Sequence, residues 1–237
     1  MRTSTHCLHF FSSLLFFLRH QHRSPINQIS IEEKGEYVGS CSDYQVVILE
    51  LYSRETVYSA SFDKPLKTLC LDPTYGSSSA RRFVLGEADR LMLYERNILG
   101  RYRSSCLQHA RGVIRATTWR TTFIAWASDL CIKIYDVAGR ALITHIDREK
   151  ETDYRIKADR FQCSFCWKDN LTLLTAWGGS IKMCCIKRKA FESELSLTSI
   201  GLGSSSSGNA GGNGGDRGQQ PRYYVELGEY THKHTFL

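Results

Sequence analysis

The sequence predicts an all-β fold, because short apolar runs broken by turn residues dominate it from residue 24 to about residue 189. Four segments repeat one pattern: an apolar run, a turn of small or acidic residues, and a second apolar run. This pattern is typical of a β-hairpin. The hairpins recur at a nearly constant interval, and further alternating runs lie between them.

The spacing of the hairpins indicates the architecture. Each hairpin pairs a first run with a second: residues 39–43 with 46–49, 84–89 with 91–94, 124–129 with 132–135, and 174–179 with 181–184. Taking Val46, Leu91, Ile132 and Ile181 as equivalent positions gives intervals of 45, 41 and 49 residues. WD-type propeller blades repeat at about 40–45 residues, with four strands each. The sequence therefore predicts an incomplete WD40-like β-propeller of about four degenerate blades.

Three runs between the hairpins alternate apolar and polar residues and fit the inner strand of a blade: residues 66–71, 114–119 and 161–167. The Trp-Asp dipeptide that names the WD repeat is absent. An aromatic residue followed by an acid stands in its place, as Tyr94-Glu95 and Tyr135-Asp136. We therefore expect the buried Asp–His network of an ideal blade to be missing.

The chain divides into four parts. Residues 1–23 form an apolar and basic leader, residues 24–190 the blades, residues 191–220 a Gly/Ser-rich linker, and residues 221–237 the start of a further, truncated strand. The linker has eight Gly and four Ser within residues 201–220, so we expect a disordered loop.

The leader leaves an alternative open. Residues 8–18 read LHFFSSLLFFL, which is similar to the apolar region of a signal peptide but is followed by no small-residue cleavage site. Eleven apolar residues are too few for a transmembrane helix, which needs about 20. A secreted or membrane-associated β protein is the alternative, and the sequon at Asn170 would matter only in that case.

Composition excludes some classes of function. The formal net charge is +7, but three of these charges belong to Arg2, Arg19 and Arg23, and no basic patch with interleaved aromatic residues is present. Nucleic acid is therefore not an expected partner. The nine cysteines are odd in number and scattered among apolar residues, which favours reduced thiols in the cytoplasm over a disulfide scaffold.

The residue types that carry chemistry predict no catalytic residue, no cofactor and no metal. Cys163 and Cys166, with Cys184 and Cys185, offer four thiolates for zinc, but an odd offset along a strand directs each pair to opposite faces. His109 and His145 stand apart from any nucleophile motif, and no phosphate-binding or hydrolase motif occurs. The four tryptophans are expected in the core: Trp119, Trp126, Trp167 and Trp177. The basic triplet 187–189 is expected in a solvated loop, with at most weak contact to an acidic membrane.

Several segments resemble one known family. They are residues 26–30 (INQIS), 62–67 (FDKPLK), 124–127 (IAWA), 132–136 (IKIYD), 163–170 (CSFCWKDN) and 222–226 (RYYVE). The most specific is CSFCWKDN. Together they resemble the N-terminal propeller of the vacuolar protein sorting-associated protein 41 family, over roughly residues 25–226.

The resemblance implies a non-enzymatic scaffold of the HOPS membrane-tethering complex. Members are cytoplasmic, are recruited to late endosomes, lysosomes or vacuoles, and act with other HOPS subunits and a Rab GTPase in protein transport and autophagosome clearance. No small-molecule substrate is implied. The family continues with more blades and a helical solenoid, so we expect a truncated, marginally stable chain that cannot tether membranes by itself. A generic WD-repeat adaptor in another pathway is the remaining alternative.

Overall fold

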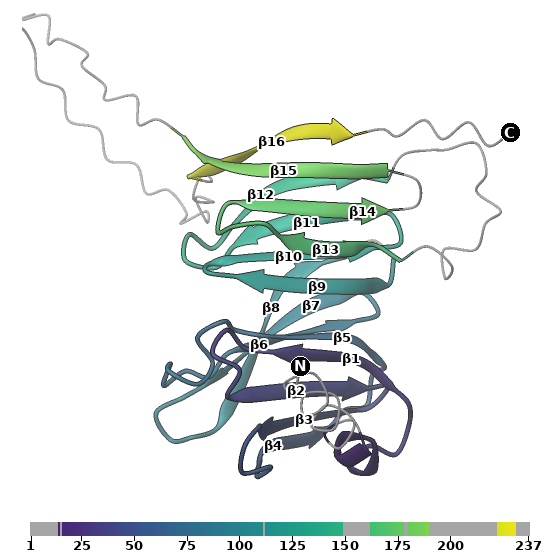
Figure 1. The fold of residues 1–237 in the computed structure, drawn as a ribbon, viewed down its shortest axis with the longest axis vertical. Helices are drawn as coiled ribbons and strands as arrows, with labels where there is room; N and C mark the ends of the chain where they lie inside the picture. Colours follow the sequence, from purple (N-terminus) through teal and green to yellow (C-terminus); the bar gives the residue numbers. More distant parts are fainter. Residues whose placement is uncertain are drawn as a thin grey trace, which may run out of the picture.

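A computed structural model describes residues 14, 16–110, 112–148, 162–177, 180–189 and 222–230. These residues form four antiparallel sheets of four strands each, which stack one beside the next from β1–β4 to β13–β16 (Figure 1). The predicted all-β, four-bladed architecture is therefore confirmed, and the propeller is incomplete and unclosed.

Each sheet is a meander whose strands follow the chain in order. The first contains β1 (Ile26–Ile31), β2 (Tyr37–Ser42), β3 (Gln45–Glu50) and β4 (Thr56–Ser61). The second contains β5 (Leu66–Leu71), β6 (Phe83–Glu87), β7 (Arg90–Arg96) and β8 (Tyr102–His109). The third contains β9 (Ile114–Arg120), β10 (Phe123–Ser128), β11 (Cys131–Asp136) and β12 (Ala141–Asp147). The fourth contains β13 (Ser164–Trp167), β14 (Thr172–Trp177), β15 (Ser180–Arg188) and β16 (Tyr223–Tyr230).

The first strands of neighbouring sheets run parallel to one another. Near the start of β1, Asn27 Nδ2 donates to the Leu66 carbonyl at the start of β5. Near its end, Ser30 Oγ accepts from Leu71 N at the end of β5. Antiparallel meanders that begin in the same direction place corresponding turns together. Connections between first and second strands, and between third and fourth, therefore share one end of the molecule. We call it the Ile98 end, after a residue of the β7–β8 connection, and the opposite one the Asp-turn end.

Apolar side chains between successive sheets form the core, in three clusters. Sheets one and two share Cys41, Val46, Ile48, Leu66, Leu69, Leu71, Tyr75, Phe83 and Leu85. Sheets two and three share Cys70, Val84, Leu91, Leu93, Ile114, Trp119, Ile124, Trp126 and Tyr135. Sheets three and four share Phe123, Ala125, Ala127, Ile132, Ile134, Ile146, Cys163, Leu173, Cys184 and Ile186. This face-to-face burial is the packing that a propeller predicts.

The described part of the apolar leader belongs to the folded core. Residues 16–21 are helical, and Leu14 and Leu18 are buried against Val38, Val47 and Leu49 on the outer face of the first sheet. A spacing of four residues places Leu14 and Leu18 on one face of a helix. The division at residue 24 is therefore not a boundary in the fold, because the segment before it covers the sheet after it.

The leader also supplies part of a buried polar network in the first blade. The ring of His22 lies 2.7 Å from Ser40 Oγ through Nε2 and 3.0 Å from Ser42 Oγ through Nδ1. All three residues are buried. Burial lowers the pKa of His22, which favours the neutral ring. This network links a histidine to two serines and contains no aspartate, so it differs from the Asp–His network of an ideal blade.

The fourth sheet differs from its sequence-based description in two places. Strand β13 begins at Ser164, later than the predicted run 161–167, since Gln162 and Cys163 are not in a strand and residue 161 lies outside the described residues. Strand β16 pairs with β15 from Arg188↔Tyr223 to Ile181↔Tyr230, so it completes the fourth blade and does not begin another. The Gly/Ser-rich linker lies outside the described residues.

The outer face of the fourth sheet presents Ile181 and Tyr224, which are 50% and 40% exposed. Within the described residues no further sheet packs on that face. The predicted marginal stability stays a prediction. None of the helices that the structure describes is long and apolar enough to cross a membrane.

Candidate interaction surface

The two ends of the blade stack differ in how their charges are paired. At the Asp-turn end, the turn between the second and third strands carries an aspartate in three blades: Asp43, Asp89 and Asp129. Each has a basic partner, since Lys67 Nζ lies 2.9 Å from Asp43, Arg90 Nε 3.1 Å from Asp89, and Arg115 Nε 2.9 Å from Asp129. Asn27 and Lys67 lower the pKa of Asp43, and Arg90 lowers that of Asp89. The three turn aspartates of this end are therefore all ion-paired.

The Ile98 end carries a hairpin tip, residues 97–100, between β7 and β8. Asn97 Oδ1 accepts hydrogen bonds from the backbone N–H groups of Leu99 and Arg101, at 3.0 and 2.9 Å. Gly100 adopts φ +77°, a conformation that side-chain-bearing residues rarely take, and its N–H donates to the Asn97 carbonyl. The backbone of the tip is thus fixed by its own turn. Ile98 and Leu99 are 103% and 76% exposed.

Four arginines surround this tip without an acidic partner in the part of the chain that the structure describes. Arg96 precedes the tip, Arg101 and Arg103 follow it, and Arg81 lies on the neighbouring β5–β6 connection. Four other arginines of the stack are ion-paired: Arg82 to Asp72, Arg90 to Glu87 and Asp89, Arg115 to Asp129, and Arg120 to Glu33.

Two carboxylates lie close to the tip. Glu95 is the cross-strand neighbour of Arg103, and Glu36 lies beside Gly76. The four arginines outnumber these two carboxylates, so the surroundings of the tip carry a net positive charge.

The tip and the β5–β6 connection enclose a shallow pocket of about 550 Å³. The lining combines two arginines, three serines and one apolar side chain of the tip, the residues being Gly76, Ser77, Ser78, Ser79, Ala80, Arg81, Arg96, Asn97, Ile98 and Gly100. Arg96 N donates to the Ala80 carbonyl at 2.6 Å and ties the two loops together.

Aromatic residues hold Arg81 in place at the wall of this pocket. Its guanidinium lies 5.0 Å from the ring centre of Tyr37 and 5.8 Å from that of Tyr75, and it donates to the Tyr37 hydroxyl. The hydroxyls of Tyr75 and Tyr102 lie 2.8 Å apart. Burial raises the pKa of Tyr75, which keeps this phenol neutral. Arg81 therefore contributes a positive charge with no phenolate to offset it.

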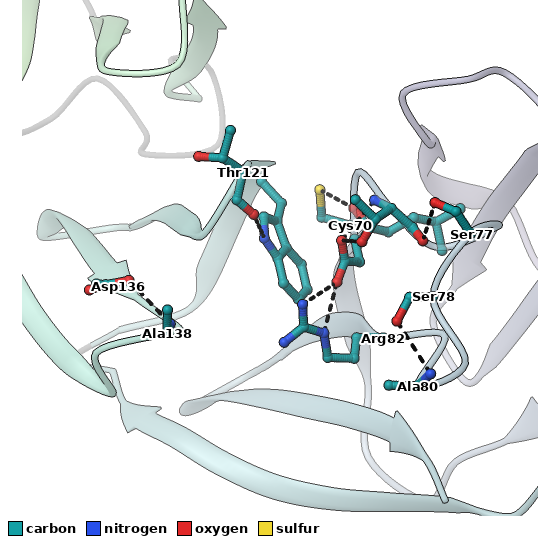
Figure 2. A network of polar contacts seen from close by, with 12 residues as sticks. Cys70, Ser77, Ser78, Ala80, Arg82, Thr121, Asp136 and Ala138 are labelled. Carbon is teal, nitrogen blue, oxygen red and sulfur yellow. Dashed lines mark hydrogen bonds and ion pairs between the residues drawn. The ribbon is translucent and has the colours of Figure 1, made fainter. Parts of the chain in front are cut away.

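A buried ion pair lies within the β5–β6 connection, and its arginine contacts the third blade. Asp72 Oδ2 accepts from Arg82 Nη2 and Nε, at 2.7 and 2.8 Å, and Asp72 Oδ1 accepts from the backbone N–H and hydroxyl of Thr74. The Arg82 guanidinium lies 5.5 Å from the ring centre of Trp119, whose indole N–H donates to the Thr121 carbonyl. Figure 2 shows Arg82 between this indole and the loop that carries Ser77, Ser78 and Ala80.

Each cysteine pair considered for zinc has one buried member and one that is more exposed. Cys163 and Cys184 are buried between sheets three and four, whereas Cys166 is exposed and Cys185 half-buried. Burial raises the pKa of the Cys163 thiol to about 12 and that of Cys184 to about 11. The described residues contain no cluster of three or more metal-ligating side chains.

The remaining sequence candidates serve packing or lie alone on the surface. Trp119 and Trp126 are buried in the core between sheets two and three. Trp167 is half-buried and donates its indole N–H to Thr118 Oγ1, 3.0 Å away. His145 lies 3.1 Å from the exposed Asp147 on the surface. The structure brings none of these residues together into a site.

Sequence reasoning missed the hairpin tip. The signal was present in residues 96–101, RNILGR, in which two apolar residues stand within a turn bounded by Asn97 and Gly100. Apolar residues rarely occupy turns, which favour Gly, Asn and Asp. The exposure of the pair became evident only when no neighbouring loop covered it.

The four stacked meanders define the class of protein: an incomplete β-propeller. The family model Beta-prop_Vps41, described as "Vps42 beta-propeller", matches residues 6–207. The chain belongs to this family. The match begins at residue 6 and so includes most of the leader that the sequence analysis placed outside the resemblance.

Curated relatives agree with the family match. Over 165 residues the chain is 41% identical to the vacuolar protein sorting-associated protein 41 homolog of Danio rerio and 40% identical to that of Homo sapiens. The Schizosaccharomyces pombe protein is 29% identical over 182 residues. The first two matches cover 69% of this chain but 19% of each relative, so the chain spans about a fifth of their length.

A solved structure supports the fold alone. It is the crystal structure of the Myceliophteria thermophila Cps50 (Swd1) β-propeller domain, with a TM-score of 0.53 and 13% sequence identity. The similarity covers 71% of this chain and 56% of that one.

Proposed function

We propose that this chain is a non-enzymatic propeller module of a HOPS-type membrane-tethering scaffold, acting in transport to the lysosome or vacuole. Its partners are other HOPS subunits and a Rab GTPase, and it works in the cytoplasm at the surface of late endosomes and lysosomes. Late endosome–lysosome fusion and autophagosome clearance are the processes that it serves.

The observation that carries this proposal is the extent of the family match. Identity of about 40% extends over 165 residues, 69% of the chain, and is not confined to single motifs. The relatives are named for vacuolar protein sorting, and this chain corresponds to part of their propeller. Propeller blades present their loops on rigid sheets, an arrangement suited to holding partners.

The test is a domain exchange in cells that lack the full-length relative. The corresponding propeller segment of that relative is replaced by residues 6–230 of this chain, which include β16, and delivery of a fluorescent cargo to lysosomes is measured. We expect the exchanged protein to restore delivery. Residues 1–237 expressed alone are expected not to restore it.

A matched control separates family-specific function from fold. The same segment is replaced by blades of the Cps50 (Swd1) propeller, which shares the fold at 13% identity. That control is expected to fail. If the exchange with this chain also fails while the protein is expressed and assembles with HOPS subunits, the proposed function is wrong.

A further inference from the structure

We propose that the Ile98 end docks on an anionic lipid bilayer, with the hairpin tip entering the membrane interface and the surrounding arginines contacting lipid phosphates. This contact would bring the proposed tethering module to a membrane, so the inference rests on the proposed function.

The most exposed apolar side chains lie at the Ile98 end. Ile98, Leu99 and Tyr52 are the most exposed large apolar residues in the described part of the chain, at 103%, 76% and 75%. All three lie at the Ile98 end, since Tyr52 belongs to the β3–β4 connection. Ile98 and Leu99 are adjacent in the hairpin tip, and exposed apolar residues that lie together indicate an interaction site.

The shape of the hairpin tip favours a lipid interface over a protein interface. Ile98 and Leu99 project from a tip whose backbone is already closed by Asn97 and Gly100, so their exposure does not require the loop to move. Two side chains on a narrow tip offer little flat area for a protein interface, which usually buries about 800 Å² on each partner. A lipid interface adapts to such a projection and takes up apolar side chains to a depth of about 5–10 Å.

Arginines around the tip favour an anionic membrane. Arg81, Arg96, Arg101 and Arg103 have no acidic partner among the described residues, whereas the turn aspartates of the Asp-turn end each have a basic partner. Basic residues beside an anionic membrane favour binding, and apolar insertion adds to that effect. Because Ile98 lines the pocket that Arg81 and Arg96 also line, a lipid phosphate there would lie beside the acyl region that Ile98 and Leu99 enter.

The test is flotation of residues 1–237 with vesicles of phosphatidylcholine, with and without phosphatidylserine, at low and high salt. We expect binding to the phosphatidylserine vesicles that weakens at high salt, and little binding to phosphatidylcholine alone. The variant Ile98→Ser/Leu99→Ser should bind about tenfold more weakly. The variant Arg96→Gln/Arg101→Gln should lose about fivefold per arginine.

The control is Tyr44→Ser/Leu130→Ser, which removes two exposed apolar residues (53% and 54%) from the Asp-turn end. It should bind as the unmodified chain does. No binding to anionic vesicles, or unchanged binding by the tip variant, overturns the inference. The domain exchange distinguishes the two proposals. If cargo delivery is restored but the chain does not bind vesicles, this inference is wrong and the proposed function stands.

Discussion

Replacing Asp72 by Ala should destabilise the chain, because this buried carboxylate holds Arg82, which lies over Trp119 of the third blade. Asp72 accepts two hydrogen bonds from Arg82 and two from Thr74, and its side chain is 1% exposed. Removing one member of a buried ion pair costs about 3–5 kcal/mol, since the other charge stays uncompensated. The Arg82 side chain is 29% exposed and can turn toward water, so we expect a loss of about 2–4 kcal/mol.

The assay is urea unfolding followed by tryptophan fluorescence, which senses Trp119 under Arg82. Asp63→Ala, at an exposed aspartate of the β4–β5 connection, is the matched control and should change stability by no more than about 0.5 kcal/mol. Asp72→Asn keeps the shape and should cost less, which provides a measurement if the alanine variant does not fold. Equal unfolding midpoints for the Asp72→Ala and Asp63→Ala variants would refute the reasoning.

Three further predictions concern the leader and the thiols. Leu18→Ala should lower stability by about 2–5 kcal/mol in urea unfolding, whereas Phe16→Ala on the exposed face of the same helix should not; equal effects would contradict the packing. Burial lowers the pKa of His22, so the unfolded chain binds its proton more readily. Stability should therefore fall as pH drops below about 6.5, and His22→Gln should reduce this dependence; identical pH profiles would disprove the idea. Cys166 should react with iodoacetamide in the folded chain and Cys163 only in urea, as judged by mass spectrometry; comparable rates would argue against the described burial.

The hairpins show what could be predicted from the sequence. The interval between Val46, Leu91, Ile132 and Ile181 is a local property of the chain, and all four residues lie near the start of the third strand of a blade. Alternation of apolar and polar residues likewise predicted β5 over residues 66–71 and β9 from residue 114. Both signals depend only on neighbours along the chain.

The leader shows what could not be predicted. Its composition resembles an export signal, yet Leu14 and Leu18 pack on the first sheet and His22 bonds to Ser40 and Ser42. Nothing in residues 1–23 alone specifies the sheet on which they lie. The histidine–serine network could not be predicted for the same reason, because His22 is about twenty residues from Ser40 and Ser42.

Sequence by itself determined the strands, their grouping into blades and the family. These follow from periodicity and from residue identities that are read locally. Tertiary structure decided which polar residues are paired and which apolar residues remain uncovered. Arg82 and Arg81 are adjacent in sequence, but only Arg82 meets a buried carboxylate, while Arg81 lies against tyrosine rings at the pocket beside Ile98. Exposure and charge pairing depend on side chains contributed by distant strands, so they exist only once the blades have stacked.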